Sequence, residues 1–286
     1  MRIAIIGGAG RMGEWFTRYF LKQEHEVIIS DVRADKARVI ANSLGVTLAS
    51  NNVEAARMAD LTFVSTPIDV TPKVLSEISP ELREPMIVAE ISSIKSRVMP
   101  VLKKIAEKGV RTLSIHPLFG PGLQEIAGEK IALIPVHNQS AEEALTKSFF
   151  PGARIITVEC EKHDRVMALT LALTHFINIV FASVVSEEEM QILKQLGGTT
   201  FTLQLAISEG VMTEDPMLYA SIQIDNEHTL NYLENFMLKA NLLKEIVRKK
   251  DFDGFIEFYR VSRDSLSRDE DFPIAYERVY RALKAL

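Results

Sequence analysis

The sequence is poor in several features that would mark other classes of protein. Its 286 residues include one cysteine, Cys160, and no long run of lysine and arginine. A single cysteine excludes an intrachain disulfide and a multi-thiolate metal site, and it fits a reducing cytoplasm. The net charge is −5, from 33 Lys and Arg against 38 Asp and Glu, which leaves no electrostatic footprint for nucleic acid or for an anionic membrane. We therefore expect a cytoplasmic protein that binds neither metal nor nucleic acid.

Charged residues are missing from one stretch of the chain. The 21 residues of Val166–Ser186 contain no Asp, Glu, Lys or Arg, and a run of that length could span a bilayer. Six of its residues are nevertheless polar: Thr170, Thr174, His175, Asn178, Ser183 and Ser186. Such side chains are tolerated where they face protein or a wet cavity. We therefore expect no membrane span but a buried helix at the core of a homodimer.

Glycine and proline are unevenly distributed and divide the chain in two. Residues 1–152 hold 10 of the 14 glycines and 9 of the 11 prolines, so the first half changes element often and the second half rarely does. Short Ile- and Val-rich segments alternate with amphipathic ones in the first half, which predicts a Rossmann-type, doubly wound parallel sheet. We predict an α/β fold, with a dinucleotide-binding domain over 1–160 and an all-helical substrate and dimerisation domain over 161–286.

The individual elements follow from the apolar spacing. The predicted strands are Arg2–Ile6, Val27–Asp31, Leu61–Ser65, Ile87–Ile91, Thr112–Ile115, Ile131–Pro135 and Arg154–Val158. Helical patterns cover Met12–Lys22, Asp35–Leu44 and Val98–Lys108. In the second half, apolar residues at intervals of three and four predict a long helix over Met217–Val247, interrupted at most near Asp225–Glu227.

A glycine-rich motif follows the first predicted strand. Gly8-Ala9-Gly10-Arg11-Met12-Gly13 has the G-x-G-x-x-G pattern, in which glycines permit a tight turn, close approach of the backbone to a pyrophosphate, and packing of helix on strand. The positive end of the next helix would face the phosphates. The alternative, a glycine-rich surface turn, is disfavoured because the motif lies between a strand and a helix.

An acidic residue at the end of the second strand supports the same function. Asp31 lies 21 residues after Gly10, where a carboxylate can bind the ribose 2′-hydroxyl and favours NAD over NADP. Arg33 is a nearby cation that could partly accommodate a 2′-phosphate. Ser65-Thr66-Pro67 follows another strand at the carboxyl edge of the sheet, where the nicotinamide half of the cofactor would lie.

One of the six histidines has the position of a catalytic base. His116 ends a predicted strand and is followed by Pro117 and a Gly-Pro-Gly segment that stops regular structure. Imidazole is suited to accept a hydroxyl proton near neutral pH. Ser93 ends the preceding strand at the same edge and could orient the substrate, cap a helix over Lys95–Ala106, or do both. His25, His137 and His228 have polar surroundings typical of surface residues.

Two further histidines lie in the second half of the chain. His163 precedes Asp164 at a predicted helix start, where capping and a supporting polar role are both open. His175 lies within the uncharged run, with Thr174 and Asn178 at spacings that share a helical face. These three polar side chains of the run predict a helix face that lines a solvated space.

These motifs together resemble the prephenate dehydrogenase family. The resemblance rests on the glycine motif, Ser65-Thr66-Pro67, Ser93-Ile94-Lys95, His116-Pro117-Leu118-Phe119-Gly120-Pro121, His163-Asp164 with the later His175, and Asp215-Pro216-Met217-Leu218-Tyr219-Ala220. It implies an NAD-binding domain and a helical dimerisation domain. It also implies oxidative decarboxylation of prephenate to 4-hydroxyphenylpyruvate in tyrosine biosynthesis.

The family resemblance also implies roles for single residues. His116 would accept a hydrogen bond from the ring hydroxyl, Ser93 would orient that hydroxyl, and His175 would bind the side-chain end of the substrate. In one respect the sequence departs from the family, because Thr202–Ser221 contains no arginine to hold the ring carboxylate. The candidate cations are Lys194, Arg260, Arg263 and Arg268.

Three other functions stay open at this point. Arogenate, the amino counterpart of prephenate, could be the substrate. The chain could instead be another two-domain nicotinamide-dependent hydroxy-acid dehydrogenase, although such enzymes usually rely on a lysine in the helical domain. A non-catalytic NAD-sensing protein would keep the glycine motif and Asp31 but would not need His116, Ser93 and His175 together.

Overall fold

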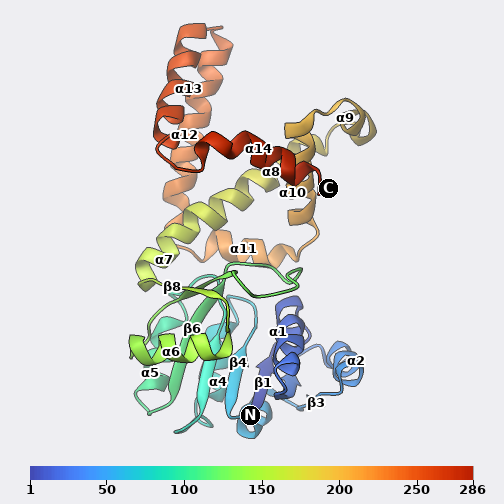
Figure 1. Cartoon of the computed structure of the whole chain (residues 1–286), viewed down its shortest axis with the longest axis vertical. Helices are drawn as coiled ribbons and strands as arrows, with labels where there is room; N and C mark the ends of the chain where they lie inside the picture. The colour runs from blue at the N-terminus through green and yellow to red at the C-terminus, as the bar shows by residue number, and fades with distance from the viewer. Residues whose placement is uncertain (286) are drawn as a thin grey trace. The chain divides into compact units, whose positions relative to one another are not determined.

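The computed structural model describes residues 1–285, which form two compact units. The division falls between Met167 and Ala168. The first unit is an eight-stranded sheet covered by helices, and the second consists of helices (Figure 1). The predicted α/β fold class is confirmed.

The sheet has the strand order β3-β2-β1-β4-β5-β6-β7-β8. Its strands are β1 (Arg2–Ile6), β2 (Glu26–Ser30), β3 (Thr47–Leu48), β4 (Leu61–Val64), β5 (Ile87–Glu90), β6 (Arg111–Pro117), β7 (Lys130–Leu133) and β8 (Arg154–Thr157). The first six strands run parallel to one another. From β1 the strand order proceeds in one direction to β2 and β3 and in the other direction to β4, β5 and β6, so it reverses between β1 and β4. That reversal is the switch point at which α/β folds of this kind bind ligands.

Two strands correct the prediction of a wholly parallel sheet. β7 runs antiparallel to β6, with His116 opposite Ala132, and β8 runs parallel to β7. A parallel pairing of β6 and β7 would require a crossover connection, usually a helix. The connection over residues 118–129 contains no helix, so β7 returns antiparallel. The two-residue β3 is a further strand that the sequence pattern did not predict.

Helices cover both faces of this sheet. The helices of the first unit are α1 (Arg11–Lys22), α2 (Ala34–Leu44), α3 (Asn52–Met58), α4 (Thr71–Ile78), α5 (Met99–Ala106), α6 (Gln139–Phe149) and α7 (Cys160–Met167). On one face, Phe16 and Phe20 of α1 pack with Phe149 of α6 against the strands. On the other face, Leu75 of α4 and Leu102 of α5 belong to a second cluster. Burial on both faces explains why the strands read as continuous Ile and Val.

The described part of the second unit, residues 168–285, contains helices and no strand. Its elements are η1 (Ala168–Leu173), α8 (Thr174–Val185), α9 (Met190–Leu196), α10 (Thr199–Met212), α11 (Pro216–Ile224), α12 (Thr229–Arg248), α13 (Phe252–Leu266), η2 (Phe272–Ile274) and α14 (Ala275–Leu283). The predicted interruption near Asp225 is present between α11 and α12. The helical segment Cys160–Val185 carries the uncharged run and is long and apolar enough to cross a membrane by length and composition.

Candidate active site

The glycine motif forms a tight turn between β1 and α1. Gly7 has φ of +85°, a conformation that other residues rarely adopt. A Cβ on Gly13 would lie 2.1 Å from the Gly7 carbonyl oxygen, and a Cβ on Gly8 would lie 2.7 Å from Cβ of Ile29. Gly10 precedes α1 and supplies no side chain to cap it. Side chains are therefore excluded at Gly7, Gly8 and Gly13, and the turn presents the positive N-terminal end of α1, as a phosphate site requires.

Asp31 lies immediately after β2 and beside this turn. Its carboxylate accepts hydrogen bonds from the backbone N–H of Ala9 at 2.9 Å and from the backbone N–H of Arg33 at 2.9 Å. The Arg33 guanidinium donates to both carboxylate oxygens, at 3.0 and 3.1 Å. Burial acts to raise the pKa of Asp31, but these hydrogen bonds outweigh it and the pKa is lowered. The group is therefore a carboxylate at neutral pH.

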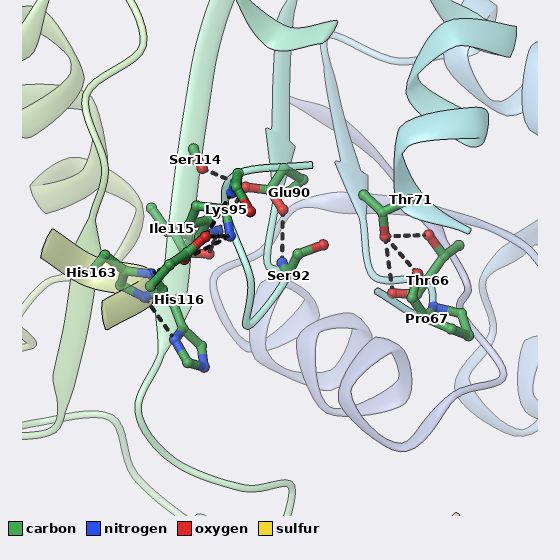
Figure 2. A network of polar contacts seen from close by, with 12 residues as sticks. Thr66, Pro67, Thr71, Glu90, Ser92, Lys95, Ser114, Ile115, His116 and His163 are labelled. Carbon is green, nitrogen blue, oxygen red and sulfur yellow. Dashed lines mark hydrogen bonds and ion pairs between the residues drawn. The ribbon is translucent and has the colours of Figure 1, made fainter. Parts of the chain in front are cut away.

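Arg33 and the segment Ser65–Pro67 adjoin the same turn. A Cβ on Gly10 would lie 3.8 Å from Nη2 of Arg33, and a Cβ on Gly7 would lie 2.4 Å from the Ser65 carbonyl oxygen. The Thr71 hydroxyl donates to the Pro67 carbonyl at 2.9 Å and lies 2.8 Å from the Thr66 hydroxyl, which fixes the loop after β4 (Figure 2). The structure thus brings together the residues that the sequence assigned to cofactor binding.

His116 lies near the carboxyl end of β6 and is 6% exposed. Its Nδ1 lies 3.1 Å from Nε2 of His163 on α7 (Figure 2). Nδ1 of His163 in turn lies 2.8 Å from a carboxylate oxygen of Asp164. Asp164 also accepts the backbone N–H groups of Lys95, at 2.9 and 3.1 Å, and of Ser96, at 2.8 Å. Asp164, His163 and His116 thus form a hydrogen-bonded series that ends on His116.

Burial determines the protonation of this series. It lowers the pKa of His116 well below its ordinary value, and repulsion from Lys95 and from the protonated form of His163 lowers it further. Burial also lowers the pKa of His163, even though the carboxylate of Asp164 acts to raise it. Both imidazoles are therefore neutral at neutral pH, and a neutral imidazole is what a proton acceptor needs to be.

A buried ion pair supports the loop behind His116. Lys95 and Glu90 have fully buried side chains, and Nζ of Lys95 lies 2.7 Å from both the Glu90 carboxylate and the Ile115 carbonyl oxygen. The Ser114 hydroxyl and the backbone N–H of Ser92 also donate to Glu90 (Figure 2). These bonds tie the loop after β5 to β6, one residue before His116.

Ser93 follows β5 by three residues and is half-buried. Its expected capping of a helix over Lys95–Ala106 is wrong, because α5 begins only at Met99 and is preceded by Val98. Residues 95 and 96 instead use their N–H groups to hold Asp164. The neighbouring Ser92 is buried, and its hydroxyl has no hydrogen-bond partner among the described residues.

In the second unit, the three polar residues predicted to share a face have different surroundings. The Asn178 side-chain oxygen accepts hydrogen bonds from Gln204 at 2.8 Å and Ser208 at 3.0 Å, and its nitrogen donates to the Thr174 carbonyl. Asn178 therefore ties α8 to α10. His175 packs against the ring of Tyr219, 4.6 Å between centroids, and its buried Nδ1 has no partner among the described residues. The Thr174 side chain is exposed.

Two of the four candidate cations already have acidic partners. Nζ of Lys194 lies 2.8 Å from Glu209, and Arg260 lies 2.9 Å from Glu257. Arg263 and Arg268 lie in or just after α13.

Sequence reasoning missed two groups near His116. The first is the Glu90–Lys95 pair, which has no signal in a local pattern because its partners are distributed over β5, β6 and the loop between them. The second is the contact between His163 and His116, 47 residues apart. The adjacent His163-Asp164 pair is the available signal, but its position at a predicted helix start fits capping as well as a supporting polar role.

The fold and the glycine turn define a doubly wound nucleotide-binding protein. The chain matches the family model for the prephenate dehydrogenase nucleotide-binding domain over residues 17–138 and that for the prephenate dehydrogenase dimerization domain over residues 159–261. It belongs to the prephenate dehydrogenase family.

Relatives and solved structures agree with this assignment. A Methanocaldococcus jannaschii protein named "Probable arogenate/prephenate dehydrogenase" is 30% identical, with 91% of this chain and 60% of that protein covered. The T-protein of Haemophilus influenzae is 27% identical, over 92% of this chain and 66% of its own length. The chain thus spans about two thirds or less of the length of these relatives.

A crystal structure of prephenate dehydrogenase from Aquifex aeolicus, in complex with hydroxyphenyl propionate and NAD+, has the same fold. Its TM-score is 0.75 at 18% identity, and the superposition covers 94% of this chain and 98% of that one.

Proposed function

We propose that this chain catalyses the NAD-dependent oxidative decarboxylation of prephenate to 4-hydroxyphenylpyruvate in tyrosine biosynthesis. The observation that carries the proposal is His116, a buried and neutral imidazole at the end of β6. It lies on the same carboxyl edge of the sheet as the glycine turn after β1 and the loop after β4. A proton acceptor and a dinucleotide site on one edge are the parts that oxidation of a carbinol requires.

The residues around the glycine turn fit NAD. The turn built by Gly8, Gly10 and Gly13 would let the pyrophosphate approach the start of α1, where the backbone at Arg11 and Met12 would hold it. The Asp31 carboxylate would bind the adenosine ribose, and its negative charge supports NAD rather than NADP. Ser65, Thr66 and Pro67 would lie along the nicotinamide half. When bound, NAD accepts the hydride from the substrate.

The chemistry asks little of the protein beyond positioning and one base. Loss of hydride and CO₂ converts the substrate ring into an aromatic one, which provides the driving force. His116 would accept the proton of the ring hydroxyl, and Ser93 would orient that hydroxyl. Correct placement and a positioned base are each large effects, the base alone contributing about 10²–10⁴-fold.

The helical unit would complete the substrate site. His175 would bind the side-chain end of the substrate, and its unpartnered Nδ1 supports this role. Thr174 and Asn178 lie within one turn of it, although Asn178 has its oxygen engaged by α10. The dianionic substrate requires a cation, and Arg263 and Arg268 fit better than Lys194 and Arg260, which are paired with acids.

The same unit would form a homodimer through the uncharged run. In the segment Cys160–Val185, the most apolar window has a mean hydropathy of 2.0, and only 22% of it is buried within the chain. The family model for a dimerization domain covers this run. Burial against a second copy supplies the covering that the chain itself lacks, so we infer a dimer core in place of a membrane span.

A direct assay tests the proposed function. Purified full-length protein is incubated with NAD or NADP and with prephenate, arogenate or a small 2-hydroxy acid, and reduced nicotinamide is followed by its absorbance. We expect turnover with prephenate and NAD. Turnover with arogenate alone would change the substrate within the family, and turnover with the 2-hydroxy acid alone would replace the reaction class. Binding of NAD without oxidation of any of the three would indicate a sensor.

A further inference from the structure

Asp164, His163 and His116 form a hydrogen-bonded series, and its geometry determines which ring nitrogen of each histidine carries the proton. Neutral imidazole carries one N–H and one bare nitrogen, and the two cannot be distinguished by ring position alone. Here each contact restricts the next one. The first restriction comes from Asp164, which lies 2.8 Å from Nδ1 of His163.

Asp164 is a carboxylate that only accepts hydrogen bonds. It takes the backbone N–H groups of Lys95 and Ser96 in addition to its contact with His163. Burial acts to raise its pKa, but these hydrogen bonds outweigh the effect and the pKa is lowered. An ionised carboxylate facing a ring nitrogen at 2.8 Å requires a proton on that nitrogen. Nδ1 of His163 is therefore the N–H, and Nε2 of His163 is bare.

The second restriction follows from the first. Nε2 of His163 faces Nδ1 of His116 at 3.1 Å in a buried environment. Two bare nitrogens at this distance would leave both buried groups without a hydrogen-bond partner, which is unfavourable. Because Nε2 of His163 can only accept, Nδ1 of His116 must donate.

We propose that Asp164 and His163 are positioning residues that fix His116 in the tautomer with a proton on Nδ1 and leave Nε2 as the bare acceptor atom. That the accepted proton comes from the ring hydroxyl of the substrate rests on the function proposed above. The tautomer itself does not depend on it. Asp164 and His163 touch neither the hydroxyl nor the nicotinamide in this assignment, and they act through His116.

The assigned tautomer balances the reaction step. Nε2 of His116 would take the ring hydroxyl proton, bound NAD would supply the hydride acceptor for the C4 hydrogen, and the electron pair of the ring–carboxylate bond would enter the ring as CO₂ departs, which leaves a phenolate beside the imidazolium. The resulting imidazolium keeps its Nδ1–H bonded to His163. The Asp164 carboxylate stabilises the positive charge through His163, while the ammonium of Lys95 opposes it and Glu90 offsets Lys95.

Spectroscopy of the unliganded protein tests the tautomer directly. In full-length protein labelled with [15N]histidine, long-range proton–nitrogen correlations report which ring nitrogen of each histidine carries the proton. We expect His116 to be protonated on Nδ1 in the wild type. Protonation of His116 on Nε2 overturns the proposal, and this result needs no variant to fold.

Three variants separate the positioning role from a merely structural one. In Asp164→Asn, the amide oxygen can keep the backbone N–H groups while its nitrogen donates to His163, which reverses both tautomers. We expect Nε2 of His116 to become the N–H and turnover to fall about 10²–10⁴-fold, as wrong-tautomer substitutions do in serine-protease triads. His163→Gln places an acceptor oxygen opposite His116 and should keep its tautomer. His163→Leu removes that acceptor and should lose it.

The controls distinguish this proposal from the proposed function. His137→Gln alters an exposed histidine in the loop before α6 and should change neither the tautomer nor turnover. If Asp164→Asn reverses the tautomer in a protein that oxidises no substrate, the positioning role of Asp164 and His163 stands and the proposed function fails. If the wild type oxidises prephenate while Asp164→Asn and His163→Leu retain both the tautomer and full turnover, the positioning role is wrong and the function stands.

Discussion

The two units of the chain bury their apolar residues to different extents. In the first unit, the side chains of β1, β4 and β5 are almost entirely inaccessible apart from Arg2, and three clusters fill the faces of the sheet. In the second unit, large apolar residues on several helices remain exposed, among them Leu196 at 83% and Phe252 at 81%. Exposed apolar surface on this scale marks an interaction site. The first unit has a complete core of its own, and the second lacks one unless another protein surface covers it.

Polar residues differ in the same sense. Around His116 the first unit buries charged and titratable groups that satisfy each other through short contacts. In the second unit the titratable His175 has a buried nitrogen without a partner among the described residues. This difference is the one expected if the second unit is completed by a ligand and a second copy, as proposed above.

The largest expected effect is on the chemistry of the first unit. His116→Asn removes the proton acceptor but leaves the glycine turn and the β6 backbone in place. We expect turnover to fall about 10²–10⁴-fold, with NAD affinity measured by calorimetry unchanged. A variant with near wild-type turnover would remove His116 from the mechanism, whatever its effect on stability.

The next effect is on the stability of the first unit. Lys95→Met leaves the fully buried carboxylate of Glu90 without its cation. Breaking a buried pair in this way costs about 3–5 kcal/mol in the free energy of unfolding, which denaturant titration can measure. The exposed Lys73 on α4 provides the matched control, because Lys73→Met should change stability by no more than about 0.5 kcal/mol.

A double substitution sharpens this stability test. Glu90→Gln combined with Lys95→Met removes both charges, and we expect it to recover part of the loss. If the double variant is less stable than Lys95→Met alone, the pair is not the source of the effect.

A smaller effect should distinguish the surfaces of the two units. Leu238 on α12 is 65% exposed and Val39 on α2 is 68% exposed, so the two side chains are equally accessible in the single chain. If the second unit is covered by another copy, Leu238→Arg should weaken self-association about tenfold or more, because burying one such side chain contributes about 1.5–3 kcal/mol. Val39→Arg should have no effect. Sedimentation over a concentration series measures both.

Much of the first unit was predictable from sequence, because strong local patterns coincide with what the fold requires. The glycine turn, Asp31 after β2 and His116 at the end of β6 are each set by a few adjacent residues. The direction of β7 was not predictable, since alternation and composition indicate a strand but carry no direction. The helix expected from Lys95 begins at Met99 because Glu90 and Asp164 hold the intervening residues, and such contacts are long-range.

In the second unit, residue spacing predicts a shared polar face, but the elements packed around α8 give its three polar residues different surroundings. Thr174, His175 and Asn178 do lie within one turn, yet Asn178 is buried against α10 while Thr174 is exposed. Helical periodicity fixes the angle between side chains and does not identify the element that each one meets.

The smallest expected effect is a shift of the pH profile, and it bears on the first unit alone. His116 must be neutral to accept a proton, so activity is lost as pH falls through its pKa. Burial lowers that pKa, and His163 and Lys95 lower it further, so the acid limb of kcat/KM should lie below the ordinary histidine value of about 6.5. A base with the ordinary value would lose about fourfold between pH 8 and pH 6, and we expect a smaller loss. His175 also has a pKa lowered by burial, so its protonation should not add a limb at higher pH. The profile of His175→Asn separates the two histidines: an acid limb unchanged in this variant assigns it to His116, whereas a limb that disappears would place the titrating group in the second unit.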